Sequence, residues 1–259
     1  MTVVDRASRD FLTACGGMAQ VLCKALLETG LGEHYRVRLP RKQLAIETDS
    51  GTVRVSVGGT RRRPVLLTDM TSFVKECYRV GVSTIQVAGV EATKVGRFLV
   101  ADAEKIHEKY PDADFNTMNR NAVDILMEMQ ADYDRQHFSD ARNADYSLHR
   151  MYPDDPTRGR VLFPHNITGG HVEPCCGSGS VAIAISLAHA KRLRDGVSSL
   201  RFDCGGTPVL GGPDTTKVKA TILDSRILTA EFTHSLVEIV STGKVSLRSA
   251  ESHEPSGKS

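Results

Sequence analysis

Two cysteines of this chain stand directly before a glycine, and each is followed by an apolar run. The two segments read Cys15-Gly16-Gly17-Met18 and Cys176-Gly177-Ser178-Gly179. A thiol in the first turn of a helix lies at the positive end of the helix dipole, which lowers the pKa of the thiol and favours the thiolate. Each of the two cysteines is therefore a candidate base for proton transfer.

The glycines beside the two cysteines indicate what such bases would act on. Glycine lets a ligand approach the backbone closely, and helix N-termini commonly bind anions through their N–H groups. Two such turns facing each other would hold a small carboxylate between two thiols. One thiolate could remove the proton beside the carboxylate while the other thiol returns one, with the N–H groups stabilising the charge that develops. The pattern predicts racemisation, epimerisation or a double-bond shift, chemistry that needs neither a metal nor a pyridoxal cofactor.

The other cysteines are expected to be structural. Cys175 is a rival for the catalytic role, but Cys176 carries the glycine that matches the first segment, so we assign Cys175 to packing. Cys23, Cys77 and Cys204 stand in apolar or strand-like contexts. The six cysteines contain no C-x2-C pair, which disfavours a zinc site, and are too sparse for a disulfide scaffold.

Both cysteines introduce the same order of elements, which indicates an internal repeat. Apolar residues at helical spacing follow Cys15 up to Gly30, and a nearly continuous apolar run follows Cys176 up to a basic turn before Gly196. The second helix should be fully buried because it is apolar on all sides. Alternating segments predict the strands that follow each helix, namely 35–39, 44–48 and 53–57 in the first copy and 199–203 and 217–222 in the second.

The middle of the chain and its end are less regular. We expect an extended segment at 83–88, helices at 101–110 and 121–133, a loop at 151–156, and a strand at 160–163 that leads to Cys176. Residues 243–259 are polar and are expected to form a frayed tail.

Composition limits the classes of partner. The chain has 259 residues, a net charge of +2, 40% hydrophobic residues, 5% aromatic residues and no tryptophan. It therefore lacks the strong positive field and the stacking side chains that nucleic-acid binding requires. No run is long enough to span a membrane, and the first 30 residues do not have the order of a signal peptide, so we expect a cytoplasmic protein.

At these residues the sequence resembles the diaminopimelate epimerase family, within the wider group of cofactor-independent racemases, over residues 14–57 and 161–240. The family motifs are Cys-Gly-Asn-Gly, which Cys15-Gly16-Gly17-Met18 matches in part, and Cys-Gly-Ser-Gly or Cys-Gly-Thr-Gly, which residues 176–179 match fully. The resemblance implies an α+β fold of two pseudo-symmetric halves, each a central buried helix wrapped by a mostly antiparallel sheet, with the site between them. It also implies that Cys15 and Cys176 are the acid/base pair.

Three departures from the family leave the substrate open. Where the family has Glu-Arg-Gly, whose arginine binds the substrate carboxylate, this chain has Ile167-Thr168-Gly169. Gly17 replaces the motif asparagine, and the polar Gly-Asn-Pro-His turn is replaced by residues 89–92. Only 14 residues precede Cys15, fewer than in the family, so we expect a shortened first half that the C-terminal strand completes.

These observations define the expected organisation, site and function. The halves are expected at 1–62 and 63–242. The expected substrate-binding residues are Gly16, Gly17, Asn116, Thr168, His171, Gly177, Ser178 and Gly179, with His165 as a weaker candidate. We expect an isomerase acting on a small carboxylate, foremost an amino acid, and possible pairing into a homodimer. The alternative is a catalytically inactive homologue that binds a ligand or a partner.

Overall fold

The computed structural model describes residues 3–4, 11–12, 16–36, 42–48, 51–60, 63–115, 120–137, 145–163, 176–204 and 215–234. The helices are α1 (Gly16–Glu28), α2 (Leu31–His34), α3 (Thr71–Val80), α4 (Ala103–Lys109), α5 (Arg120–His137) and α6 (Gly177–His189). The strands are β1 (Val3–Val4), β2 (Phe11–Leu12), β3 (Gln43–Thr48), β4 (Gly51–Thr60), β5 (Arg63–Asp69), β6 (Val82–Val87), β7 (Val90–Val95), β8 (Phe98–Asp102), β9 (Asp145–Tyr152), β10 (Asp155–Leu162), β11 (Gly196–Cys204), β12 (Thr215–Leu223) and β13 (Arg226–His234).

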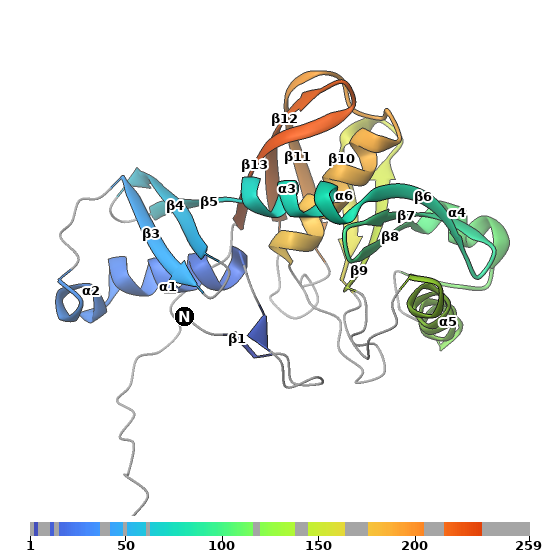
Figure 1. The fold of residues 1–259 in the computed structure, drawn as a ribbon, viewed down its shortest axis with the longest axis horizontal. Helices are drawn as coiled ribbons and strands as arrows, with labels where there is room; N and C mark the ends of the chain where they lie inside the picture. The colour runs from blue at the N-terminus through green and yellow to red at the C-terminus, as the bar shows by residue number, and fades with distance from the viewer. Residues whose placement is uncertain are drawn as a thin grey trace, which may run out of the picture.

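Eleven of these strands form one continuous sheet in the order β3-β4-β5-β13-β12-β11-β10-β9-β8-β7-β6. Only the β10–β11 and β8–β9 pairs within it are parallel. The β3–β5 strands and α1 lie at one end of the molecule, and β6–β13 curl around α6 at the other (Figure 1). The two ends are joined where β13 pairs with β5 through Glu231 opposite Asp69 and Phe232 opposite Thr68.

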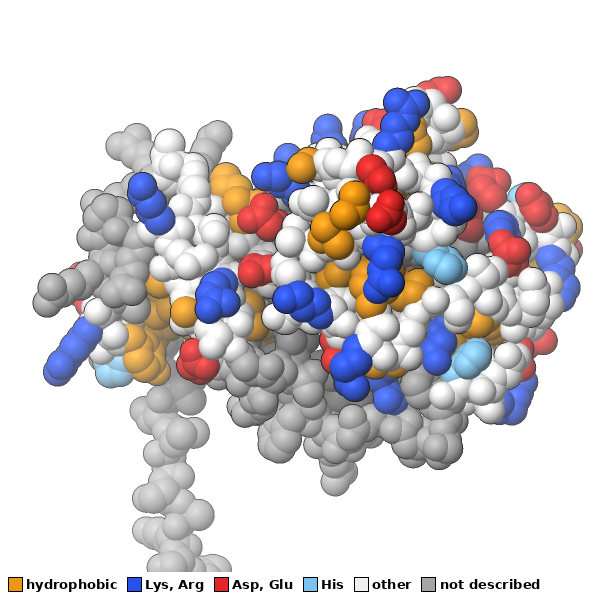
Figure 2. All heavy atoms as spheres, turned by 45° about the horizontal axis from the view of Figure 1, so that its top comes forward, with side chains coloured by type: hydrophobic (Ala, Val, Ile, Leu, Met, Phe, Trp, Pro, Cys, Tyr) orange, Lys and Arg blue, Asp and Glu red, His pale blue; other side chains and the backbone are white. Residues whose placement is uncertain are grey.

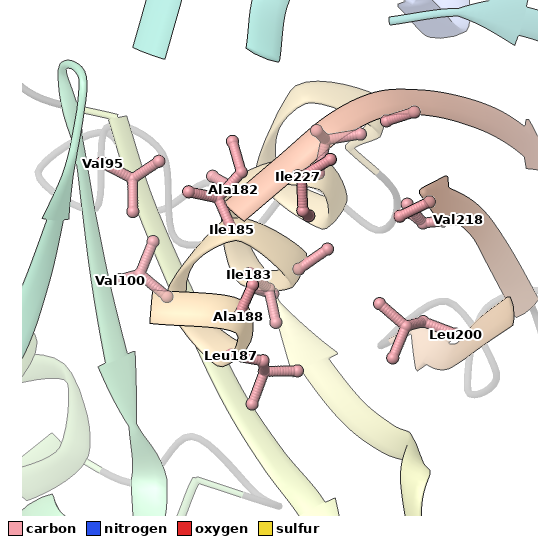
Figure 3. Packing of buried hydrophobic residues seen from close by; sticks show 14 of the residues in the cluster. Val95, Val100, Ala182, Ile183, Ile185, Leu187, Ala188, Leu200, Val218 and Ile227 are labelled. Atoms are coloured by element: carbon pink, nitrogen blue, oxygen red, sulfur yellow. The ribbon is translucent and has the colours of Figure 1, made fainter. Parts of the chain in front are cut away.

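Helix α6 is the centre of the larger end, as its apolar sequence predicts. Every residue from Gly179 to Ala188 is buried, which fits a helix that is hydrophobic around its whole circumference. Figure 3 shows its side chains between Val95 and Val100 on one side and Leu200, Val218 and Ile227 on the other. The sheet therefore encloses α6 and fixes where its first turn lies.

Helix α1 is less enclosed. Of its described side chains only Ala19, Gln20 and Cys23 are buried, and they pack against Leu44, Ile46, Val55 and Leu66 of β3, β4 and β5. Met18 and Val21 are exposed on its other side. The expected division of the chain after residue 62 falls between β4 and β5, which are neighbours in the sheet.

A third cluster lies beneath α4 and α5. Ile106 of α4 and Leu126, Met129 and Tyr133 of α5 pack against Tyr146, Leu148 and Leu162 of β9 and β10. Because successive side chains of a strand point to opposite faces, Ser147 of β9 faces α6 while Leu148 faces α4. The sheet thus carries cores on both of its faces in this region.

Two sequence predictions need correction. The segment 151–156 is a tight hairpin instead of a loop, with a two-residue turn at Pro153 and Asp154 between β9 and β10. Proline holds φ at a negative value, as in the first central residue of a type I turn, and the register of β9 with β10 shifts between Asp155 and Gly159. Tyr35 and Arg36, predicted to begin a strand, form a turn after α2, where Arg36 has a φ of 55°.

Candidate active site

Cys176 begins α6 as the sequence predicts. Its backbone is extended (φ −133°, ψ 119°), and its Sγ accepts a hydrogen bond of 3.3 Å from the N–H of Gly179. The thiol thus takes the part that serine, threonine, aspartate or asparagine usually plays at a helix start. The hydroxyl of Ser178 lies 3.3 Å from the same sulfur. The Cys176 side chain is held at the positive end of a buried helix.

The glycines of the second motif are also required by packing. A Cβ added at Gly177 would lie 3.1 Å from the ring of Phe232, and one at Gly179 would lie 2.6 Å from the ring of Phe163 and 2.8 Å from the Oγ of Ser147. Real Cβ atoms do not approach other atoms at the distances found for Gly179. The sheet can therefore close around the start of α6 as it does only because Gly179 carries no side chain, whereas a side chain at Gly177 would require the ring of Phe232 to shift.

A buried set of hydroxyl groups supports this turn. The Oγ of Ser180 donates to the carbonyl of Cys176 at 2.7 Å and lies 3.2 Å from the Oγ1 of Thr216 on β12. Thr216 pairs across the sheet with His234 of β13. Polar groups buried at a helix start need partners, and here those partners connect α6 to the ends of β12 and β13.

Helix α1 reaches the same strand end through Gln20. The buried Gln20 amide nitrogen donates to the carbonyl of Phe232 at 2.9 Å and to the Oγ1 of Thr68 at 3.1 Å, while its oxygen accepts from the N–H of His234 at 3.3 Å. Gln20 lies in the second turn of α1. Its hydrogen bonds hold that part of the helix on the junction of β5 and β13.

The second turn of α1 and the first turn of α6 therefore both contact one end of β13. Gly177 of α6 packs on the ring of Phe232, and Gln20 of α1 bonds the backbone of Phe232 and of His234. The two helices also contact each other directly.

The described residues contain only part of the predicted site. Gly16, Gly17, Cys176, Gly177, Ser178 and Gly179 lie in the first turns of the two helices. Cys15, Asn116, Thr168, His171, His165 and Cys175 lie outside the described residues. Within the part of the chain that the structure describes, no three His, Cys, Asp or Glu side chains are grouped as a metal site would require.

Two of the remaining cysteines have thiols that resist deprotonation. Burial raises the pKa of the Cys23 thiol to about 12, and burial, with the charge of Glu76, raises the pKa of the Cys77 thiol to about 12. Cys204 is also buried and lies 3.6 Å from the Oγ1 of Thr216. These positions agree with the packing role expected from the sequence.

Gln20 and β13 are features that sequence reasoning missed. A glutamine within an apolar helix gives no local signal, because its partners are distant in the chain: Thr68 is 48 residues away, and Phe232 and His234 are more than two hundred residues away. Strand β13 had a detectable signal in the sequence, because Asp224 and Ser225 separate two alternating segments. In the structure these two residues have positive φ, 50° and 60°, as in the two-residue turns that join hairpin strands.

The visible surface carries no dominant charge. Lys and Arg side chains are interspersed with Asp and Glu on the face drawn in Figure 2, with small hydrophobic areas between them. None of the described helices combines the length and the apolar character needed to cross a membrane.

Comparisons with known proteins bear on the fold. No family model matches the chain, and no curated protein matches it. A Bacillus anthracis phenazine biosynthesis protein of the PhzF family has a similar structure, with 11% identity, a TM-score of 0.50, and coverage of 87% of this chain and 74% of that chain. A hydroxyproline epimerase from Agrobacterium vitis, solved with bound trans-4-hydroxy-L-proline, also has a similar structure. It has 13% identity, a TM-score of 0.51, and coverage of 90% of this chain and 71% of that chain. The expected fold class is confirmed: this chain has an α+β fold with a large, mostly antiparallel sheet, shared with these two proteins.

Proposed function

We propose that this chain is a cofactor-independent isomerase that moves a proton on a small carboxylate, with Cys15 and Cys176 as its acid/base pair. The observation that carries the proposal is that Gln20 in the second turn of α1 and Gly177 in the first turn of α6 both contact the Phe232–His234 end of β13. Cys15 immediately precedes α1 and Cys176 caps α6. Two thiols introduced from two helices suit abstraction on one face of a carbon and delivery on the other.

Each part of the proposed site has a chemical task. The Cys176 thiolate takes the proton bound to the carbon next to the carboxylate, and its sulfur is stabilised by the N–H of Gly179. The electron pair that remains is shared with the carboxylate oxygens, which backbone N–H groups at the helix starts stabilise. The second thiol, on Cys15, then gives its proton to the opposite face of the same carbon. In the reverse direction the two cysteines exchange roles.

An amino acid is the substrate class that we favour. The hydroxyproline epimerase that shares this fold was solved with an amino acid bound, and its name describes inversion at a carbon. The PhzF-family protein is described only by its part in phenazine biosynthesis. The replacement of the family's arginine segment by Ile167-Thr168-Gly169 in this chain argues for a substrate other than diaminopimelate.

The test is proton NMR in deuterated water with reduced protein and a panel of amino acids, hydroxy acids and unsaturated acids. We expect the signal of the proton next to one carboxylate to disappear with the wild-type protein, and net turnover to be absent in Cys15→Ala and in Cys176→Ala. Full turnover in Cys176→Ala would overturn the mechanism. No exchange with any member of the panel, by folded protein, would favour a catalytically inactive homologue.

A further inference from the structure

Gln20 is a fully buried polar residue on the face of α1 that packs against the sheet. Its buried neighbours on the helix, Ala19 and Cys23, belong to an apolar cluster with residues of β3, β4 and β5. Burial of an amide is unfavourable unless its hydrogen bonds are restored, and an apolar side chain would fill the same space without that cost. A glutamine at this position therefore indicates a requirement for a defined orientation, which apolar packing alone does not provide.

The Gln20 amide uses both of its ends on two strands. Its nitrogen donates to the carbonyl of Phe232 at 2.9 Å and to the Oγ1 of Thr68 at 3.1 Å. Its oxygen accepts from the N–H of His234 at 3.3 Å. These bonds occupy the donors and the acceptor of the amide, and hydrogen bonds depend on angle as well as distance, whereas the hydrophobic effect has no direction. Gln20 therefore fixes both the rotation and the height of α1 on the strands.

The partners of Gln20 lie where the two ends of the sheet are joined. Among the described residues, β5 and β13 pair only at Asp69 opposite Glu231 and at Thr68 opposite Phe232, whereas β4 and β5 pair along the whole of β5. A junction of two residue pairs has few ladder hydrogen bonds to resist a change in the angle between the ends. Gln20 binds both strands at one of these pairs, so it braces the junction from α1.

The same strand end supports the start of α6. The ring of Phe232, whose carbonyl accepts from Gln20, packs against Gly177, where an added Cβ would lie 3.1 Å from that ring. From His234, whose N–H donates to Gln20, the set of buried hydroxyl groups continues to the carbonyl of Cys176. Gln20 is thus connected to the Cys176 turn through both of its partners on β13.

We propose that Gln20 is a positioning residue of the two-cysteine site, which fixes the first turn of α1 relative to the first turn of α6. This inference rests on the proposed function. Gly16 lies about one helical turn before Gln20, which is about 6 Å along the axis at 1.5 Å per residue. An orientation set at Gln20 is therefore carried to Gly16 and to Cys15, which directly precedes it.

The two halves of the reaction should depend on Gln20 to different degrees. Transfer of a proton from one face of a carbon to the other needs both thiols in place, and a displacement of about 1 Å lowers such a rate by up to about 100-fold. The Cys176 sulfur is held by the N–H of Gly179 within α6, without a contribution from α1. Loss of the Gln20 amide should therefore impair the step that uses Cys15 and spare the step that uses Cys176.

Gln20→Met tests this, because methionine is unbranched, adapts to the available space and lacks the amide. With a substrate found in the NMR panel, interconversion of its stereoisomers should fall by about 10- to 100-fold. One stereoisomer should still exchange its proton with deuterated water, the same one that Cys15→Ala exchanges. Unchanged interconversion would overturn the proposal. An equal loss of exchange from both stereoisomers would show a role in stability alone and would also overturn it.

Two further variants separate positioning from general loosening of α1. Leu22→Ala is the matched control, because it truncates a partly buried side chain of α1 and leaves the Gln20 amide in place; its interconversion rate should stay close to that of the wild type. Thr68→Val removes one partner of the amide without a change in α1, and should act in the same direction as Gln20→Met but less strongly. Circular dichroism confirms that each variant is folded. A loss in Leu22→Ala as large as that in Gln20→Met would contradict the proposal.

A measurement without substrate distinguishes failure of this proposal from failure of the proposed function. Diamide oxidises two thiols to a disulfide and takes up their two hydrogens, and thiols held close together react faster than thiols held apart. The Cys15–Cys176 disulfide, identified by mass spectrometry of peptides, should form at least about 10-fold more slowly in Gln20→Met than in the wild type. Alkylation of Cys176 by iodoacetamide should be unchanged.

The outcomes of this measurement differ for the two proposals. If no member of the panel exchanges a proton but the disulfide forms and is slowed in Gln20→Met, the isomerase activity is refuted and the positioning role stands. If the wild type forms no such disulfide, or if Gln20→Met forms it at least as fast, the positioning role is refuted whatever the activity.

Discussion

Helices α1 and α6 begin with related sequences and reach the same strand end, yet they are held there by different means. Helix α6 is buried from Gly179 to Ala188, so its position follows from apolar packing on all sides. Helix α1 is covered mainly on its β3–β5 side, and the polar side chain of Gln20 connects it to β5 and β13. A paired site can thus be assembled from one helix fixed by burial and one fixed by hydrogen bonds.

The largest difference in stability between the two helices should appear when one of their apolar side chains is truncated to alanine. Ile183 of α6 is fully buried, so Ile183→Ala should lower the free energy of unfolding by about 2–5 kcal/mol. Leu22 of α1 is only partly buried, so Leu22→Ala should cost about 1 kcal/mol. Urea unfolding followed by circular dichroism measures both. Similar losses in the two variants would contradict the difference in enclosure.

The glycines of the two motifs give a second comparison. Gly179→Ala places a Cβ against Phe163 and Ser147, and overpacking of this kind should cost about 1–3 kcal/mol. A Cβ at Gly17 would meet nothing within 4 Å, so Gly17→Ala should change stability by less than about 1 kcal/mol in either direction. Thermal unfolding of the two single variants tests this, and a destabilised Gly17→Ala with an unaffected Gly179→Ala would reverse the assignment.

Removal of the Gln20 side-chain amide should loosen α1 and leave α6 in place. Gln20→Leu deprives the Phe232 carbonyl and the His234 N–H of these partners, and each buried unpaired group costs about 1–3 kcal/mol. Hydrogen exchange should accelerate in α1 and at the end of β13 but not in the middle of α6. Gln136→Leu, which removes an exposed amide, is the control, and uniform acceleration over both helices would show that Gln20 acts on global stability alone.

Acid should affect the larger end of the molecule through His149. Burial lowers the pKa of His149 from 6.5 to about 4, an effect to which the charges of Arg192 and Lys105 contribute and which that of Asp102 opposes. The unfolded chain therefore binds a proton that the native state does not bind between pH 6.5 and 4, so stability should fall as the pH falls through this range. The Nδ1 of His149 has no partner among the described residues. His149→Leu should therefore reduce the loss of stability between pH 6.5 and 4 without leaving a hydrogen-bond partner unpaired.

Unfolding curves between pH 4 and 7 measure this effect, with the exposed His107→Gln as the control. If His149→Leu loses as much stability between pH 6.5 and 4 as the wild type does, the acid sensitivity belongs to other groups.

Local sequence predicted much of the frame. The apolar run after Cys176 predicted a buried helix, and the alternating segments predicted β3, β4, β11 and β12, because these signals depend on periodicity within a few residues. Helix α3 and strands β5, β8 and β13 were not predicted as separate elements. Their places depend on partners that are distant in the chain, as the pairing of Phe232 with Thr68 shows.

The candidate site was predictable only in part. The Cys-Gly motifs identified the first turns of both helices, since a thiol and a glycine at a helix start have a recognisable chemistry. The contacts that join those turns, from Gln20 and from the ring of Phe232, follow from the tertiary fold alone. The neighbouring positions of Arg150 and Arg160 also had no sequence signal, because the two residues become neighbours only through the register of β9 and β10.

The central claim is that two cysteines act on opposite faces of one substrate carbon. Once a substrate is known, deuterium incorporation should be followed separately from each of its two stereoisomers with Cys15→Ala and Cys176→Ala. The account predicts that each variant loses interconversion by at least about 10²- to 10⁴-fold, and that each still exchanges the proton of only one stereoisomer, a different one for each variant. Interconversion retained in either variant, or exchange of both stereoisomers by a single variant, would contradict it.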